Sequence, residues 1–202
     1  MLLKKISFWL FLCLLTGLTS QLYAQQADLM LGFEVGTLFP HGDFKKKSGH
    51  GYFPGIEILK CIYNKKVFSL VEPQRSLFLN ANADFYFMRP KTQGDIKYEP
   101  VIVAIRGGIN YIAGTILSGT MLHIGVGAYS IFTETKQLKT NAVGLVSEVR
   151  LSSTTETKPG ICFGAGINSS FFNFSGKYHI VFTGGETTNI VSLSVIIRKK
   201  IK

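Results

Sequence analysis

The chain has 202 residues and a formal net charge of +10, with 46% hydrophobic and 17% charged residues. This length predicts a single folded domain, and three cysteines are too few for a disulfide-framed secreted module. The basic balance alone would fit nucleic-acid binding. The strand-rich pattern described below supplies neither a groove-reading helix nor a stacking platform, so we expect no nucleic-acid partner.

The N-terminus has the pattern of a secretory signal peptide. Lys4 and Lys5 precede an apolar run at 6–15, and the small residue Ala24 closes the more polar stretch that follows. This order predicts a signal peptide over residues 1–24 and a mature domain over residues 25–202. The apolar run is too short to be a membrane-spanning helix.

Eight strand-like runs follow in chain order, separated by turn residues. We place them at 30–39, 53–63, 77–88, 98–112, 119–133, 160–171, 177–184 and 188–199. Most of them reach the ~9–11 residues that a tilted strand needs to cross a membrane, whereas soluble strands most often have about 5–6 residues. A short helix is expected at 67–71, and 134–159 is expected to be the longest connection.

The third run shows how the side chains alternate. Every odd position from Leu77 to Phe87 is apolar, whereas the even positions include Asn80, Asn82 and Asp84. A soluble barrel with an apolar core and a membrane barrel with an apolar outside both produce this pattern. In most runs the polar face holds Gly, Asn and Ser more than Lys, and the lysines gather mostly in connections and at chain ends. We therefore infer that the apolar face lies outside, against lipid.

The second run is less regular. Ile56 and Ile58 share a face with Lys60, whereas Glu57 shares the other face with Leu59. A β-bulge would repair the alternation, but the register of this run stays open. The whole pattern predicts an all-β fold, an eight-stranded antiparallel up-and-down transmembrane β-barrel of the size of OmpA and OmpX. Such a barrel belongs in the cell outer membrane, with both ends of the chain periplasmic and the long 134–159 connection extracellular.

Several polar residues would then face the interior of the barrel. The candidates are Glu34, Asp84, Arg106, Asn110 and His123. We expect Glu34 and Asp84 to neutralise Arg106, because unpaired charges in a dry interior are costly. Such a polar plug would block the flow of solutes. The alternative is that Arg106 lines a narrow path for anions.

Glycine and aromatic placements along the chain resemble one known family. They comprise the segment GTLFPHGDF at 36–44, GVGAY at 125–129, FGAGI at 163–167 and the glycine pair at 184–185. In this order, after a signal peptide, they resemble the PorT-like outer membrane β-barrel proteins common in Bacteroidota. The resemblance spans the mature chain. It implies a barrel in the outer membrane that serves as an accessory part of a secretion or surface-attachment system.

Three alternatives bear on function. His123 with Ser118 or Ser130 would suit an outer-membrane lipid-modifying enzyme, but spacing places no acidic partner beside them. A soluble lipocalin-like barrel that binds an apolar ligand would reverse the two faces. The histidines show no metal-ligand spacing, and whether Cys61 pairs with Cys162 stays open.

We therefore expect a protein that is not an enzyme and has no cofactor or metal. Its role would be structural or one of interaction. The expected partners are outer-membrane lipids and envelope proteins. We expect the protein to be a monomer.

Overall fold

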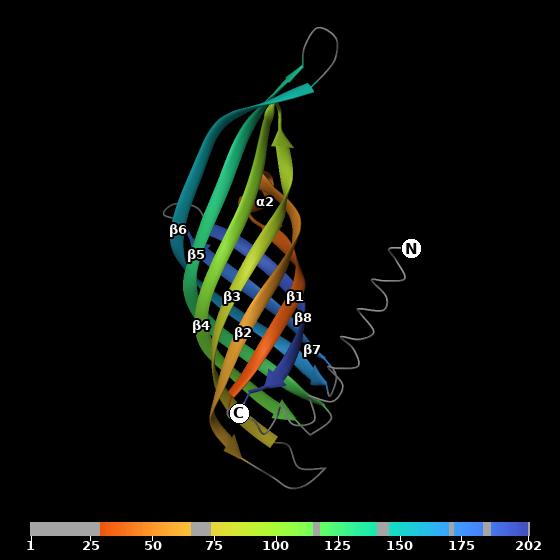
Figure 1. The fold of residues 1–202 in the computed structure, drawn as a ribbon, viewed down its shortest axis with the longest axis vertical. Helices are drawn as coiled ribbons and strands as arrows, with labels where there is room; N and C mark the ends of the chain where they lie inside the picture. Colours follow the sequence, from red (N-terminus) through yellow and green to blue (C-terminus); the bar gives the residue numbers. More distant parts are fainter. Residues whose placement is uncertain are drawn as a thin grey trace, which may run out of the picture.

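The computed structural model describes residues 29–65, 74–114, 118–140, 146–169, 172–183 and 187–201. Its elements are β1 (Leu29–His41), α2 (Phe44–Lys47), β2 (Ser48–Lys65), β3 (Gln74–Gln93), β4 (Ile96–Gly114), β5 (Ser118–Thr140), β6 (Val146–Ser169), β7 (Asn173–Phe182) and β8 (Thr187–Lys200). The strands form a closed barrel in sequence order, and β8 pairs with β1 (Figure 1). Each neighbouring pair is antiparallel. The predicted eight-stranded antiparallel barrel is confirmed.

Two predicted elements fall outside the described residues, namely the signal peptide at 1–24 and the short helix at 67–71. The one-turn helix α2 was not predicted. It connects β1 to β2 and buries Phe44, while its three lysines lie in its last turn. In the ranges that the structure describes, no helix is long and apolar enough to cross a membrane.

The outer surface of the barrel is apolar, and β5 shows this clearly. Leu122, Ile124 and Val126 are 57%, 64% and 63% exposed, whereas His123 between them is 5% exposed. The same arrangement holds on the other strands, where large aliphatic and aromatic side chains point outward. A soluble lipocalin-like barrel would have the opposite arrangement. The barrel is therefore of the transmembrane type, with its apolar face toward lipid.

The register of β2 is resolved by an irregularity in its pairing with β3, between Cys61 and Tyr63. Before this point in the chain Ile56 and Ile58 face outward, and Glu57 and Leu59 face inward. The bulge shifts the alternation by one residue and so lets β2 keep one apolar outer face.

The barrel interior is layered. One apolar cluster lies toward the end that carries α2 and comprises Leu38, Phe44, Phe53, Tyr86, Met88, Ile102, Ala104, Tyr129, Val181 and Ile190. A second lies toward the opposite end and comprises Met30, Leu59, Phe78, Ile112, Met121 and Ile196. Along β1 the inward residues run Met30, Glu34, Leu38, so the polar residues occupy the middle. The prediction of a polar interior holds mainly for this middle layer, and single polar residues such as Ser76 and Thr188 are buried nearer the two ends.

Inward glycines make room for the large polar side chains of the middle layer. A Cβ atom added at Gly127 would lie 2.6 Å from Cγ of Arg106 and would also clash with the backbone oxygen of Ile105. A Cβ atom at Gly55 would collide with the carboxylate of Asp84. The strand glycines therefore have a packing role, because only a residue without a side chain leaves space for these charged neighbours.

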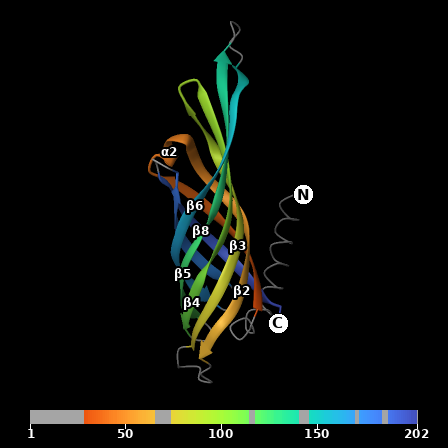
Figure 2. The ribbon, with the colours of Figure 1, turned by 90° about the vertical axis from the view of Figure 1, so that its left-hand side faces the viewer.

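The hairpin of β3 with β4 and the hairpin of β5 with β6 continue beyond the barrel, at the end that carries α2 (Figure 2). β5 pairs with β6 from Ser118 and Ser169 as far as Thr140 and Val146, so residues 134–140 and 146–159 are strand. The prediction of a long irregular connection over 134–159 is therefore wrong. Both faces of this hairpin carry polar side chains, because a hairpin in water has no buried face. The sequence there therefore lacks the alternation of apolar and polar residues that would have predicted a strand. β7 also begins earlier than predicted, at Asn173.

Candidate functional site

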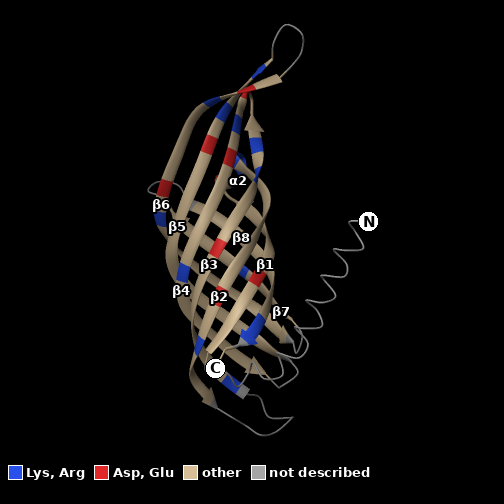
Figure 3. Cartoon of the chain, in the orientation of Figure 1, with Lys and Arg blue, Asp and Glu red and all other residues tan. Residues whose placement is uncertain are grey.

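The middle layer of the barrel is the best candidate for a functional site, because it gathers buried charged groups from six strands. The structure places all five candidate residues inside the barrel, namely Glu34, Asp84, Arg106, Asn110 and His123. Figure 3 shows acidic and basic positions at this level and again on the hairpins. The pairs that these residues form decide what the interior can do.

Arg106 on β4 pairs with Asp84 on the neighbouring strand β3. Its other terminal nitrogen donates a hydrogen bond to Sγ of Cys162, at 3.1 Å. Both members of the ion pair are at most 1% exposed at their side chains. Asp84 therefore neutralises Arg106, as the alternation along β3 and β4 led us to expect.

Glu34 pairs with Lys177 instead of Arg106. The ammonium of Lys177 donates to both carboxylate oxygens of Glu34, each at 2.7 Å, and the hydroxyl of Ser194 donates to one of them. Sequence reasoning missed Lys177, because the seventh strand was expected to begin at that residue. In the structure Lys177 lies in the middle of β7 and points inward.

A third buried pair joins Arg198 on β8 to Glu57 on β2. The guanidinium donates from Nε at 2.8 Å and from Nη2 at 3.2 Å to the two carboxylate oxygens. Such a bidentate, charge-assisted pair is stronger and more specific in geometry than a single hydrogen bond between neutral groups. Glu57 was missed as an interior candidate because the register of β2 could not be read. Arg198 lies on the inward parity of β8, a signal that could have identified it.

Neutral polar groups complete the middle layer. The ring of His123 lies 2.6 Å from the side-chain oxygen of Asn110, which also accepts a hydrogen bond from Asn80 at 2.8 Å. Toward α2, His179 lies within hydrogen-bond distance of Tyr129 and Ser192. Within the described residues, the buried charges inside the barrel are three carboxylates and three cations, so this interior carries no net charge.

The catalytic alternative receives no support from this geometry. His123 points inward, whereas Ser130 lies on the outward parity and its hydroxyl bonds Thr157 at 2.9 Å. Ser118 begins β5, five positions before His123 in the chain. No group of three or more His, Cys, Asp or Glu residues that could hold a metal ion occurs in the part of the chain that the structure describes. Cys61 and Cys162 are not joined by a disulfide.

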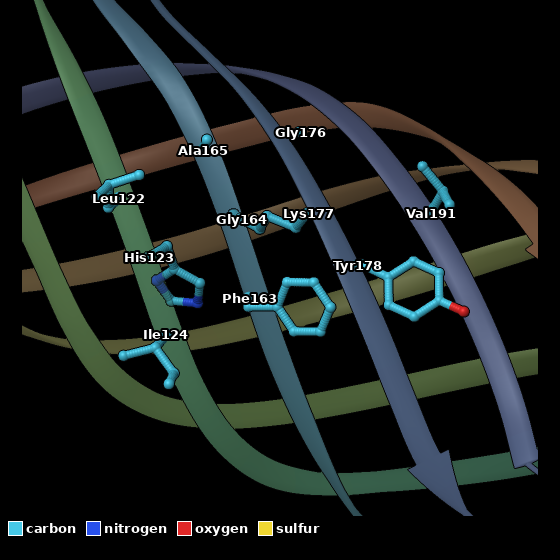
Figure 4. A pocket seen from close by; sticks show the side chains of 10 residues that line it. All are labelled: Leu122, His123, Ile124, Phe163, Gly164, Ala165, Gly176, Lys177, Tyr178 and Val191. Carbon is cyan, nitrogen blue, oxygen red and sulfur yellow. The ribbon is translucent and has the colours of Figure 1, made fainter.

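A hollow of about 560 Å³ lies on the lipid-facing wall (Figure 4). It forms where Ala165 on β6 lies opposite Gly176 on β7, because both residues lack bulk. Larger apolar side chains such as Ile124, Phe163 and Tyr178 surround it. Its lining residues include His123, Lys177 and Tyr178 but no Ser, Cys, Asp or Glu.

The hairpins carry a second group of charges, outside the membrane-spanning part of the strands. Nζ of Lys97 lies 2.8 Å from Glu99 and 2.7 Å from Glu148, and Lys136 lies 2.7 Å from Glu99. The hydrogen bond from Lys136, followed by that from Lys97, lowers the pKa of Glu99. The hydrogen bond between Lys97 and Glu148 lowers the pKa of Glu148 and raises the pKa of Lys97. These pairs connect β4, β5 and β6 above the barrel.

We expect acid to loosen the hairpins. Because the folded state lowers the pKa values of Glu99 and Glu148 below 4.5, their pairing stabilises the hairpins above that pH and is lost as the pH falls through the lowered values. Hydrogen exchange of 96–99 and 134–140, corrected for intrinsic rates, should accelerate between about pH 6 and about pH 3. Glu99→Gln should weaken this response. An unchanged response in that variant would contradict the assignment.

Comparison with known proteins gives matches by fold only. No protein-family model matches the chain, and no curated protein does either. Neisserial surface protein A is similar in structure with a TM-score of 0.49 and 12% identity, covering 87% of this chain and 98% of its own. The outer membrane enzyme PagL has a TM-score of 0.47 and 12% identity, over 85% and 99% of the two chains. Ail, the attachment invasion locus protein of Yersinia pestis, has a TM-score of 0.44 and 10% identity, over 84% and 95%.

Proposed function

We propose that the chain is a monomeric outer-membrane protein with a structural or interaction role, whose barrel anchors the hairpins of β3–β6 in front of the membrane. The observation that carries this proposal is the combination of an apolar outer wall with a filled, charge-neutral interior. An apolar wall is needed to contact lipid, and a filled interior leaves the protein without a channel.

The interior is closed at three levels. Eight strands enclose a space only just wide enough for side chains to fill it. The middle level holds the three ion pairs, and an apolar cluster lies on each side of it. An aqueous path would have to cross both apolar clusters. This arrangement supports a plug and not an anion path along Arg106.

The orientation follows from the unequal ends of the barrel. β1 begins and β8 ends at the same rim, where Met30 pairs with Lys200. The opposite rim carries α2 and the long hairpins (Figure 1). Outer-membrane barrels have short periplasmic turns and longer extracellular loops, so we place the hairpins outside the cell.

The exposed hairpins are the part of the molecule best placed to contact partners. The resemblance to PorT-like proteins supports an accessory role in secretion or surface attachment. One segment that carries the resemblance spans residues 36–44. It includes the outer end of β1 and the start of α2. We propose a role that is not enzymatic, and the position of His123 and Ser130 on opposite faces of β5 supports this.

Planar-bilayer recording tests the proposal. Purified protein should insert without stable conductance steps, because the interior is plugged. Arg106→Ala should produce only brief, small leak, since it removes the guanidinium between Asp84 and Cys162 and leaves a carboxylate uncompensated while both apolar clusters stay in place. Lys139→Ala, an exposed change on the β5–β6 hairpin, is the matched control and should stay silent. Large, stable conductance from the unaltered protein would refute the plug.

A further inference from the structure

The rim that carries α2 has a surplus of cations on one side of the barrel. We define the basic collar as Lys45, Lys46 and Lys47 of α2 together with Arg89 and Lys91 of β3. Within residues 41–50 and 87–93, which contain the collar, Asp43 is the single acidic residue. Lys46 pairs with Asp43 at 2.7 Å, so the five cations of the collar exceed the carboxylates of these two segments by four. Farther out, Lys97, Lys136 and Arg150 each lie beside a carboxylate.

The two parts of the collar are held together by direct contacts. Nζ of Lys91 donates to the backbone oxygen of Lys45 at 2.7 Å, and the side-chain amide of Gln93 donates to that of Lys46 at 2.8 Å. Gly49 on β2 lies beside Arg89, because a Cβ atom built at Gly49 would be 3.2 Å from that of Arg89. Figure 3 shows basic positions both beside α2 and on the adjoining end of β3. The cations therefore form one patch.

This patch lies directly above the lipid-facing wall. The outward residues of β3 are apolar from Leu77 to Phe87, and Arg89 follows on the same face about 7 Å farther along the strand. Phe87 stacks on Tyr52 of β2, with ring centroids 5.4 Å apart, and both rings are exposed on the outer wall. Aromatic side chains mark the level at which hydrocarbon gives way to headgroups. Arg89 therefore lies at headgroup level and points sideways from the wall.

We propose that the basic collar binds the phosphate of a lipid headgroup in the outer leaflet, with the acyl chains of that lipid against Tyr52 and Phe87. A guanidinium presents a planar pair of donors that matches phosphate oxygens, and the neighbouring ammonium groups add positive charge. The sideways direction of Arg89 and the aromatic pair beneath it favour a lipid over a soluble anion. The collar is thus a lipid-recognition site on one wall of the barrel.

A tryptophan reporter can test this site, because the only tryptophan of the chain, Trp9, lies in the expected signal peptide. The collar reporter, Tyr52→Trp, places a fluorophore under the collar. The control reporter, Phe182→Trp, places one on the outward face of β7, well away around the ring. Each protein is reconstituted in phosphatidylcholine bilayers that contain a minor fraction of brominated phosphatidic acid or of brominated phosphatidylcholine. Quenching then reports which lipid lies next to the indole ring.

Brominated phosphatidic acid should quench the collar reporter more strongly than brominated phosphatidylcholine at equal fraction, whereas the control reporter should show no such preference. Arg89→Gln and Lys91→Gln should each lower the apparent affinity at the collar reporter by roughly fivefold, while Lys139→Gln on the distant hairpin should leave it unchanged. No preference at the collar reporter, or a preference that both collar variants retain, would overturn the proposal. Loss of the preference on adding inorganic phosphate would show a site for free phosphate and would also overturn it.

This inference rests on the proposed membrane location, and the two can fail separately. If the barrel does not reside in the bilayer, no brominated lipid quenches either reporter. If only the collar proposal is wrong, both reporters are quenched and neither prefers phosphatidic acid. Arg89 is exposed and Lys91 is half-buried at the surface, so the variants should fold, and retained heat-modifiable mobility on gels verifies this for each one.

Discussion

Replacing Lys177 by methionine should lower the free energy of unfolding by about 3–5 kcal/mol, because it leaves the carboxylate of Glu34 buried without its cation. The side chains of both residues are at most 2% exposed, so water cannot take the place of the ammonium. Reversible urea unfolding in lipid vesicles, followed by circular dichroism, gives the measurement.

Two further variants separate this cost from a general loss of packing. The double variant Glu34→Gln with Lys177→Met removes both charges and should recover much of the lost stability, because it leaves no uncompensated ion. Lys46→Met breaks the exposed pair with Asp43 and should leave the stability nearly unchanged, because water screens and replaces an exposed pair. A double variant as unstable as Lys177→Met alone would show that the pair is not what stabilises the interior.

Ile124→Arg should destabilise the barrel by roughly 2–4 kcal/mol in bilayers, because it places a guanidinium on the lipid-facing wall far from either rim. Val149 is also an exposed apolar residue, but it lies on the β5–β6 hairpin beyond the wall. Val149→Arg should therefore change the stability little. The same unfolding assay compares the two variants. Equal tolerance would contradict a wall in contact with lipid, and a larger cost at Val149 would reverse the assignment of the two regions.

The sequence predicted the barrel wherever each strand has one face in lipid and one in the interior. β3 illustrates this, since its alternation from Leu77 to Phe87 continues without interruption along one wall. The prediction from alternation failed at β2, because the bulge near Cys61 shifts the pattern of inward and outward side chains by one residue. It also failed over 134–159, where both faces of the hairpin lie in water and no solvent difference sorts the side chains.

The ion pairs were only partly predictable for a related reason. Asp84 and Arg106 lie on adjacent strands with clear alternation, so their meeting follows from parity. The partner of Glu34 depends on which strand closes the ring beside β1 and on where β7 begins. Neither can be read from a local pattern, and for this reason Lys177 was overlooked. Pairs between strands that are distant in sequence can be predicted only when the order of all strands around the barrel is known.

Two of the three interior pairs join the beginning of the chain to its end. Glu34 and Lys177 are 143 residues apart in sequence, and Glu57 and Arg198 are 141 apart. They form only when β7 and β8 reach β1 and β2, the last step in closing an up-and-down sheet. A slip of one residue in that step would turn Lys177 and Arg198 toward lipid, at high cost. These two pairs therefore make correct closure cooperative and penalise a barrel that is closed in the wrong register.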